Sequence, residues 1–263
     1  GVAFVRVTMP DGEEHKRLAT VESLAGKLLA AGADRSSLVV AFGGGVVNDI
    51  GGFLAAVYMR GVDVVQIPTT LLAQVDAAIG GKTGVNLAEG KNLVGAFHQP
   101  KLVLVDPAAL DTLPEREYRA GLYEVIKCAI IASPPLFDLL SSRQPDVLRR
   151  KPEVIDALIT ESVRIKAEVV SGDERESDRR RILNFGHTLG HALEAETGYA
   201  RLLHGEAVAF GMRVATALAE KAGVLAAPER AAIERLIADY GPIPSLEGVA
   251  AGQLLARLGS DKK

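Results

Sequence analysis

The pattern of apolar residues changes near residue 113, and this change limits the folds that the chain can adopt. Before that point, short apolar runs alternate with stretches of helical periodicity. After it the β-branched runs end and helical periodicity continues alone. Strands alternating with helices favour a mostly parallel sheet covered on both faces. The sequence therefore predicts an α/β N-terminal domain, residues 1–112, followed by an all-α C-terminal domain, residues 113–263.

The periodicity also predicts the individual elements of each domain. In the first domain, the expected strands are 2–8, 38–42, 62–67 and 102–106, and the expected helices are 21–31 and 48–59. In the second domain, the expected helices are 115–131, 145–170, 181–196, 205–222, 228–240 and 252–258.

Composition excludes several classes of protein. Hydrophobic residues make up 48% of the 263 residues and charged residues 24%, as in ordinary globular proteins. The net charge of −3 gives no general affinity for nucleic acid or anionic membranes. No apolar run is long enough to predict a membrane span. Cys128 is the single cysteine, which excludes an internal disulfide and fits a reducing compartment.

Three of the five histidines lie within residues 187–204. His187 and His191 stand four residues apart in a predicted helix, so both side chains project from one face. His204 follows a glycine-containing break, close enough to fold back toward that face. Neutral imidazoles with acids nearby are what a catalytic zinc-type site requires. The competing interpretation, polar side chains packed between helices, suits a lone histidine better than three together.

A run of glycines, 43–45, follows a predicted buried strand and precedes a helix. This arrangement presents backbone N–H groups and the positive end of a helix dipole to a diphosphate. The usual dinucleotide fingerprint has a third glycine at position 48, where this chain has Asn48. Taken alone, the run is equally compatible with a tight turn that needs a positive φ. Thr69 and Thr70 end the next strand and are expected to cap a helix, to bond cofactor phosphate or ribose, or to do both.

Lys82 and Lys91 lie on glycine turns and form a second candidate anion site. Two lysines so placed are typical of an anion clamp, to which Arg60 adds a third positive charge. The competing interpretation is a solvated loop, which is less favoured because the region has few other polar residues.

Glu124 and Lys127 lie three residues apart in a helix that is apolar nearly all round, which predicts burial rather than a surface ion pair. A buried carboxylate needs a compensating partner, and a metal ion is one. The most charged stretch, 166–180, leads directly into the helix that carries His187. Most of it is predicted to be a solvated loop, with some of its groups beside the metal.

These motifs, in this order, closely resemble those of the 3-dehydroquinate synthase family. That family belongs to the sugar-phosphate cyclases, which are distantly related to iron-dependent polyol dehydrogenases. The resemblance extends from residue 11 to residue 263. Its strongest segments are 58–62 (YMRGV), 67–76 (IPTTLLAQVD), 80–83 (GGKT), 90–96 (GKNLVGA), 124–127 (EVIK) and 184–191 (NFGHTLGH). It implies a dehydroquinate synthase-like fold with a Rossmann-like first domain, completed by an earlier strand and by a segment after residue 263.

The resemblance also implies roles for individual residues. Glu124, His187 and His204 would ligate a divalent metal, whereas His191 would assist proton transfer with Glu176. The residues implied to line the NAD site are Glu13, Lys16, Gly44, Gly45, Val46, Asp49, Thr69, Thr70, Lys91, Leu110, Asp111 and Thr112. Those implied to hold the substrate are Arg60, Asp76, Lys82, Asn92, Lys127, Lys166, Arg180 and Asn184, of which Lys82 and Lys166 are also expected to act in catalysis.

The implied reaction converts the seven-carbon keto-acid sugar phosphate DAHP to 3-dehydroquinate with loss of phosphate. It is a step of the shikimate pathway toward aromatic amino acids. NAD would accept a hydride and later return it, and zinc or cobalt would serve as the metal. The resemblance further implies a cytoplasmic homodimer without nucleic-acid or membrane partners.

Three alternatives stay open at this point. The chain is alternatively a sister cyclase that acts on another sugar phosphate, or a metal-dependent alcohol dehydrogenase that consumes NAD in net fashion. The third alternative is a truncated, inactive remnant that binds only NAD or metal.

Overall fold

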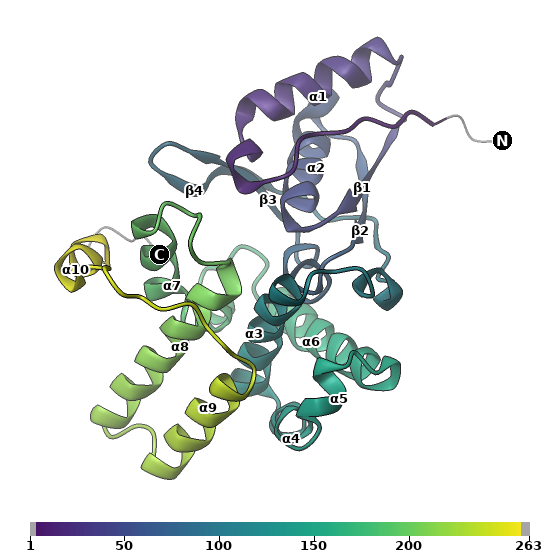
Figure 1. Cartoon of the computed structure of the whole chain (residues 1–263). Coiled ribbons are helices and arrows are strands. Elements are labelled where there is room, and N and C mark those ends of the chain that lie inside the picture. Colours follow the sequence, from purple (N-terminus) through teal and green to yellow (C-terminus); the bar gives the residue numbers. More distant parts are fainter. Residues whose placement is uncertain (1–3, 259–263) are drawn as a thin grey trace. The chain divides into compact units, whose positions relative to one another are not determined.

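The computed structural model describes residues 4–258 and separates the chain into two compact units, Gly1–Asp106 and Pro107–Lys263 (Figure 1). The predicted boundary, between residues 112 and 113, lies a short way into the second unit. No helix within residues 4–258 is long and apolar enough to cross a membrane.

The first unit contains a parallel sheet and a separate hairpin. Its helices are α1 (Leu18–Ala30) and α2 (Gly45–Val57), and its strands are β1 (Leu38–Gly43), β2 (Asp63–Pro68), β3 (Lys82–Leu87), β4 (Gly90–Phe97) and β5 (Leu102–Val103). The sheet has the order β1-β2-β5, with both pairs parallel, and β3 pairs with β4 in the antiparallel direction. This arrangement confirms the prediction of a mostly parallel sheet.

Helix α2 forms the centre of this unit because small residues let it approach the sheet closely. Gly51 of α2 lies against Ala41 of β1, where an added Cβ would come within 2.6 Å of the alanine Cβ. Ile50 and Leu54 of α2 are buried with Val64 of β2. Most of the helix therefore packs inside the unit and fixes the position of its N-terminus at the end of β1.

Two expectations for this unit are wrong. Residues 4–8 form no strand, because they pair with no neighbouring strand among residues 4–258. The residues that the structure describes do not cover both faces of the sheet, since Leu38, Val40 and Phe42 of β1 are 52%, 53% and 68% exposed. The glycine- and lysine-rich region forms the hairpin β3-β4, whose two strands the periodicity does not predict.

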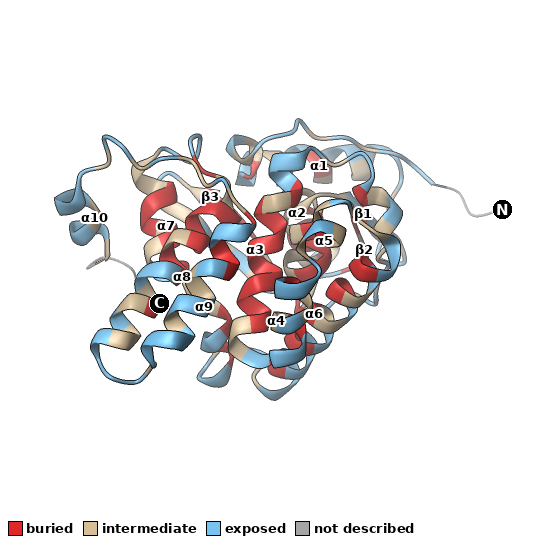
Figure 2. Cartoon of the chain, turned by 60° about the horizontal axis from the view of Figure 1, so that its bottom comes forward, coloured by how far each residue is buried: buried red, intermediate tan, exposed pale blue. Residues whose placement is uncertain are grey.

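The second unit is helical throughout its described part, as predicted. Its helices are α3 (Glu115–Ala132), α4 (Pro134–Ser142), α5 (Gln144–Leu148), α6 (Pro152–Gly172), α7 (His187–Glu196), α8 (His204–Lys221), α9 (Ala227–Asp239) and α10 (Ala251–Leu258). Helix α3 is buried over most of its length (Figure 2). It packs against α4, α6, α8 and α9, so residues on α3 reach the interior of the unit.

The helices of the second unit differ from the predicted helices at three places. The helix expected over 145–170 is two helices, since Arg150 has a φ of 55° and Pro152 starts α6. The helix expected over 181–196 is a 3₁₀ turn, Arg179–Asn184, followed by α7, with left-handed Gly186 between them. Helix α4 was not predicted, although Ser133 caps it by accepting the backbone N–H of Leu136 at 3.3 Å.

Candidate functional site

Three side chains from three helices converge inside the second unit. Glu124 projects from the middle of α3, His187 is the first residue of α7, and His204 is the first residue of α8. The Oε1 atom of Glu124 lies 3.8 Å from Nε2 of His187 and 3.6 Å from Nε2 of His204. Glu124 is 1% exposed and His187 8% exposed. The buried carboxylate that the sequence predicts is therefore present, with two imidazole nitrogens facing one of its oxygens.

The donor set fits a divalent metal ion. The Oε1 atom of Glu124 is buried and has no hydrogen-bond partner among residues 4–258, which is costly unless a cation compensates it. The three ligand atoms lie within 4.8 Å of one another. In a tetrahedral zinc site with bonds of about 2.0–2.1 Å, donor atoms stand roughly 3.4 Å apart. The observed separations are close to that value, and the donors are of the kind that zinc or cobalt accepts.

Lys127 orients the Glu124 carboxylate. Its Nζ donates a hydrogen bond to Oε2 of Glu124, and its side chain is 2% exposed. One oxygen is thereby directed to the lysine and the other toward the two imidazoles. The spacing of three residues along α3 places both groups on the same side of the helix.

His191 lies beside these residues, one turn along α7 from His187. The centroid of its ring is 5.4 Å from that of His187 and 6.0 Å from that of His204. The group formed with Glu124 does not include His191. A second group of donor atoms contains His191, Glu194 and His204. The donor group around Glu124 thus contains His204 in place of His191, which the spacing of the histidines alone does not predict.

Glycines allow the three helices to approach closely enough for their side chains to meet. An added Cβ on Gly205 would overlap the carbonyl oxygen of Ala120 in α3, and one on Gly190 would lie 3.3 Å from the backbone of Val208 in α8. An added Cβ on Gly211 would overlap the carbonyl oxygen of Gly186. Backbone therefore packs against backbone where α8 contacts α3 and α7, and this sets the separation of the ligands.

An arginine fork fixes the start of α8 against α3. Arg116 Nε and Nη2 donate to Oε1 and Oε2 of Glu206, both at 2.8 Å. Glu206 also accepts the backbone N–H of Leu203 at 2.8 Å, as the third residue of a capped helix does. Since Arg116 and Glu124 share α3 while Glu206 follows His204, this fork sets the relative position of two ligands. Sequence reasoning missed it because the partners are 90 residues apart.

Asp173 organises the loop before α7. Its carboxylate accepts the backbone N–H groups of Arg180 at 3.0 Å, Asp178 at 2.8 Å and Ser177 at 2.9 Å. These hydrogen bonds hold the pKa of Asp173 below its ordinary value. The loop thereby keeps Arg180 buried, at 1% exposed. Lys166, in α6, is also buried, at 7% exposed.

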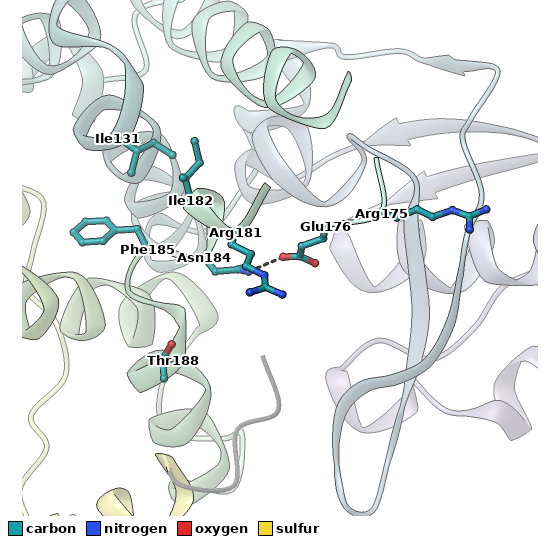
Figure 3. A pocket seen from close by; sticks show the side chains of 8 residues that line it. All are labelled: Ile131, Arg175, Glu176, Arg181, Ile182, Asn184, Phe185 and Thr188. Atoms are coloured by element: carbon teal, nitrogen blue, oxygen red, sulfur yellow. Dashed lines mark hydrogen bonds between the residues drawn. The ribbon is translucent and has the colours of Figure 1, made fainter. Parts of the chain in front are cut away.

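A pocket of about 780 Å³ opens at this loop (Figure 3). Within it, Asn184 Nδ2 donates to Oε1 of Glu176 at 2.6 Å, so two residues predicted for the site lie in contact. Arg175 and Arg181 also line the pocket and were not predicted as site residues. The signal for them was the charged stretch 166–180 and its continuation to Arg181. The complete lining is Ile131, Arg175, Glu176, Arg181, Ile182, Asn184, Phe185 and Thr188.

The glycine run of the first unit lies between β1 and α2, as predicted. Gly44 precedes α2, and Gly45 and Val46 form its first turn. An added Cβ on Gly44 would lie 3.1 Å from Cγ2 of Thr70, so a larger residue there would make a tight contact with that side chain. Asn48, which replaces the third glycine of the fingerprint, donates to the carbonyl of Ala41 at 3.3 Å. Its side chain thereby ties α2 back to β1.

Five residues predicted to line the NAD site or hold the substrate form one polar cluster in the first unit. Lys16 Nζ donates to Oδ2 of Asp49 at 2.5 Å and to Oδ1 of Asn92 at 2.6 Å. Lys91 Nζ lies 3.5 Å from Oε1 of Glu13. Burial raises the pKa of the Asp49 carboxyl, and the Lys16 ammonium opposes that rise.

Asn86 completes this cluster and was not predicted. It donates to Glu13 at 2.8 Å and accepts the backbone N–H of Asn92 at 2.8 Å. Asn86 lies in β3, and only the pairing of β3 with β4 shows that it reaches Asn92. The sequence alone therefore did not identify it.

The remaining predicted residues of the first unit are more dispersed. Thr70 accepts the backbone N–H of Ala73 at 3.2 Å, which fits the expected cap, and Thr69 donates its backbone N–H to Gly43 at 2.9 Å. Asp76 lies in a π-helical turn, Ala73–Ala77, and its charge contributes to the raised pKa of Asp49. Lys82 is the first residue of β3. Arg60 is exposed, with a φ of 70°, and joins neither the Lys16 cluster nor the glycine turn.

The turn Leu110, Asp111 and Thr112 lies in the second unit and is held by Arg150. The Nη1 atom of this arginine donates to the carbonyl of Leu110 at 2.5 Å, and Nη2 donates to that of Leu113 at 2.8 Å. The guanidinium also lies 4.5 Å from the centre of the Tyr118 ring.

Comparison with known proteins covers the whole chain. Residues 6–120 match the family described as 3-dehydroquinate synthase N-terminal, and residues 121–263 match the one described as 3-dehydroquinate synthase C-terminal. A 3-dehydroquinate synthase from Solibacter usitatus (strain Ellin6076) is 65% identical over 263 residues, which are 100% of this chain and 74% of that protein.

Two solved structures are similar to this fold. The 2-epi-5-epi-valiolone synthase from Streptomyces hygroscopicus subsp. jinggangensis 5008, with NAD⁺ and Zn²⁺ bound, is 34% identical with a TM-score of 0.88, over 96% of this chain and 71% of that one. A 2-deoxy-scyllo-inosose synthase complexed with carbaglucose-6-phosphate, NAD⁺ and Co²⁺ is 30% identical with a TM-score of 0.87, over 96% of this chain and 70% of that one.

Proposed function

Because the chain belongs to the 3-dehydroquinate synthase family, we propose that it converts DAHP to 3-dehydroquinate with release of phosphate. The observation that carries the proposal is the buried Oε1 of Glu124, which faces two imidazole nitrogens and has no hydrogen-bond partner in the described part of the chain. The reaction class is that of a phosphate-eliminating cyclase, a carbon–oxygen lyase, which uses NAD and a divalent metal.

Glu124, His187 and His204 are the proposed metal ligands. They supply three donors, as catalytic zinc sites do, which leaves coordination positions for substrate oxygens. When bound, the metal supplies positive charge that polarises those oxygens, and NAD supplies a hydride acceptor that later returns the hydride. Lys127 supports this role by holding the second oxygen of Glu124, so that the carboxylate keeps its orientation toward the imidazoles.

The proposed NAD contacts begin at the glycine turn. Gly44, Gly45 and Val46 present backbone N–H groups at the N-terminus of α2, where an anionic diphosphate is stabilised by the helix dipole. The other proposed contacts are Glu13, Lys16, Asp49, Thr69, Thr70, Lys91, Leu110, Asp111 and Thr112. Hydrogen bonds within the Lys16 cluster and from Arg150 support these assignments, because they hold the contacting side chains and the turn in fixed positions.

Cationic and amide side chains, together with the carboxylate of Asp76, are proposed to bind the phosphate, carboxylate and hydroxyl groups of DAHP. In a chain of net charge −3, binding of such an anion depends on local positive groups. The proposed contacts are Arg60, Asp76, Lys82, Asn92, Lys127, Lys166, Arg180 and Asn184. Lys166 and Arg180 are buried, so their charges are weakly screened by solvent and act strongly on a bound anion.

Proton transfer is proposed for His191 and Glu176, with Lys82 and Lys166 assisting. His191 adjoins both histidine ligands and is not in the donor group around Glu124, which suits a group that moves protons beside the metal. Asn184 donates to Oε1 of Glu176 and so orients that carboxylate within the pocket. A homodimer in the cytoplasm completes the proposal, and a single, buried cysteine, Cys128, suits a reducing compartment.

A sister cyclase is the second candidate, because the two similar solved structures are cyclases with other names. The higher identity of the Solibacter usitatus protein, 65% against 34% and 30%, favours dehydroquinate synthase. Specificity among related enzymes depends on few contacts, so substrate turnover must decide.

The deciding experiment incubates the purified chain with Zn²⁺ or Co²⁺, a catalytic amount of NAD, and DAHP. We expect phosphate release without net NADH absorbance. Stoichiometric NADH would instead indicate a dehydrogenase, and release only from a heptulose or glucose phosphate would indicate a sister cyclase. NAD or metal binding without turnover would indicate an inactive remnant. Glu124→Gln is expected to stop phosphate release, whereas Glu153→Gln, an exposed acid in the first turn of α6, is expected to leave it unchanged.

A further inference from the structure

His204 has a carboxylate at each of its two ring nitrogens. Its Nε2 lies 3.6 Å from Oε1 of Glu124, and its Nδ1 lies 3.1 Å from Oε2 of Glu194. Glu194 is in the last turn of α7 and is 1% exposed, while the side chain of His204 is 26% exposed. A carboxylate so deeply buried needs a strong donor, and the imidazole N–H is one.

The separation of 3.1 Å is that of an N–H···O hydrogen bond. A neutral imidazole carries a single N–H, so a proton held on Nδ1 by Glu194 leaves the lone pair on Nε2. The lone pair is then on the nitrogen that faces Glu124. A histidine binds a metal ion through such a lone pair. His187 is oriented more weakly, since its Nδ1 lies 3.2 Å from the backbone carbonyl of Phe185.

We propose that Glu194 is a positioning residue that holds the proton of His204 on Nδ1 and thereby turns Nε2 toward the metal. This inference rests on the proposed metal site. In this proposal Glu194 bonds to Nδ1 of His204, the ring nitrogen that does not face Glu124. Glu194 also belongs to the donor group with His191 and His204. Because the proton occupies the space between Nδ1 and Oε2, Glu194 is not itself a ligand.

The fold supports this role independently of His204. Helices α7 and α8 pack closely at Gly190, against the backbone of Ala207 and Val208. The last turn of α7 lies beside the first turn of α8, since Leu193 and Ala207 belong to one buried cluster. A carboxylate at position 194 then reaches the ring of His204 without reaching the ligand set around Glu124.

The first test measures Co²⁺ affinity by titration against a competing chelator, without substrate or NAD. Glu194→Gln keeps the size of the side chain but loses its charge, and we expect the dissociation constant to rise about 10- to 100-fold, as for other partners of metal-binding histidines. Glu194→Asp, which keeps the charge, is expected to recover part of the affinity. Glu196→Gln is the matched control, because Glu196 lies in the same helix and pairs with Arg257 instead of a histidine.

Two results would overturn the proposal. An unchanged Co²⁺ affinity in Glu194→Gln would mean that Glu194 does not act on His204. Loss of Co²⁺ as complete as in His204→Ala would mean that Glu194 is a ligand.

The second test needs no variant and no metal. Nitrogen-15 NMR of the histidine rings in the metal-free wild-type protein reports which nitrogen of His204 carries the proton. We expect Nδ1; protonation of Nε2 in the neutral ring would refute the proposal even if Glu194→Gln fails to fold. If the wild-type protein binds no Co²⁺ while His204 is protonated on Nδ1, the proposed metal site fails and the orienting role of Glu194 on His204 stands.

Discussion

Replacing Gly205 by alanine tests whether close packing of α3 and α8 builds the metal site. Gly205 follows His204, and a Cβ added to it would overlap the carbonyl oxygen of Ala120 and lie 2.7 Å from its carbonyl carbon. Backbone atoms cannot rotate away as a flexible side chain does. One methyl group must therefore push α8 away from the helix that carries Glu124.

The magnitude follows from two opposing effects. Overpacking a close contact costs about 1–3 kcal/mol, and a backbone overlap belongs in the upper part of that range. Replacing glycine by alanine in a helix returns up to about 1 kcal/mol. We therefore expect a net loss of about 1–2 kcal/mol, which for a unit of this size lowers Tm by roughly 2–8 °C. Co²⁺ affinity is expected to fall as well, because the displacement separates His204 from Glu124.

Thermal unfolding followed by circular dichroism, with and without Co²⁺, measures both effects. Gly26→Ala is the matched control, because Gly26 lies within α1 and an added Cβ there meets no atom within 4 Å. That variant should gain up to about 1 kcal/mol from helix propensity alone. The reasoning is refuted if Gly205→Ala has the Tm and the Co²⁺ affinity of the wild-type protein.

Three further predictions concern the surroundings of the site. Lys16→Met leaves Asp49 without its ammonium partner and is expected to cost roughly 3 kcal/mol in urea denaturation, with Asp49→Asn in the same chain recovering part of the loss. The pKa of Asp173 is lowered on folding, so its contribution to stability is present above its ordinary value of 3.8 and is lost as pH falls through the folded value. The difference in urea midpoint between wild type and Asp173→Asn should therefore be largest at pH 7 and narrow below pH ~3.8. Removing the metal with a chelator should lower Tm, and restoring Co²⁺ to about 100 times its dissociation constant should return about 2.7 kcal/mol.

The sequence predicted those elements whose apolar pattern matched their final environment. Periodicity predicted strands β1 and β2 and helices α1, α2, α3 and α8, all of which the structure contains. The hairpin β3-β4 was not predicted, because its glycines interrupt the alternation of apolar and polar residues. Gly84 and Gly95 lie so close across the hairpin that a Cβ on either would strike the opposite backbone, a requirement that only the paired strands reveal.

Residues 4–8 show the opposite case, since they alternate as a strand does yet pair with no strand in the described chain. The break between α5 and α6 was marked in the sequence by Pro152, which disfavours helix in the residue before it. Periodicity across the break outweighed that signal in the prediction.

The site was predictable in its residue types more than in its grouping. Burial of Glu124 followed from the apolar surface of its helix and is confirmed. Spacing alone paired His187 with His191, whereas the structure places His187 and His204 around Glu124. The donors come from three helices, so local spacing could not group them. The family resemblance supplied that set instead. The supporting contacts of Glu206 and Asp173 depend on tertiary geometry that no local pattern contains.

Metal content in two histidine variants tests the central claim most directly. Purified His204→Ala and His191→Ala, each loaded with Co²⁺ and dialysed, are compared with the wild-type protein by elemental analysis. We expect His204→Ala to lose the metal and His191→Ala to retain it at the wild-type stoichiometry. Comparable loss in both variants, or retention in His204→Ala, would contradict a site built from Glu124, His187 and His204.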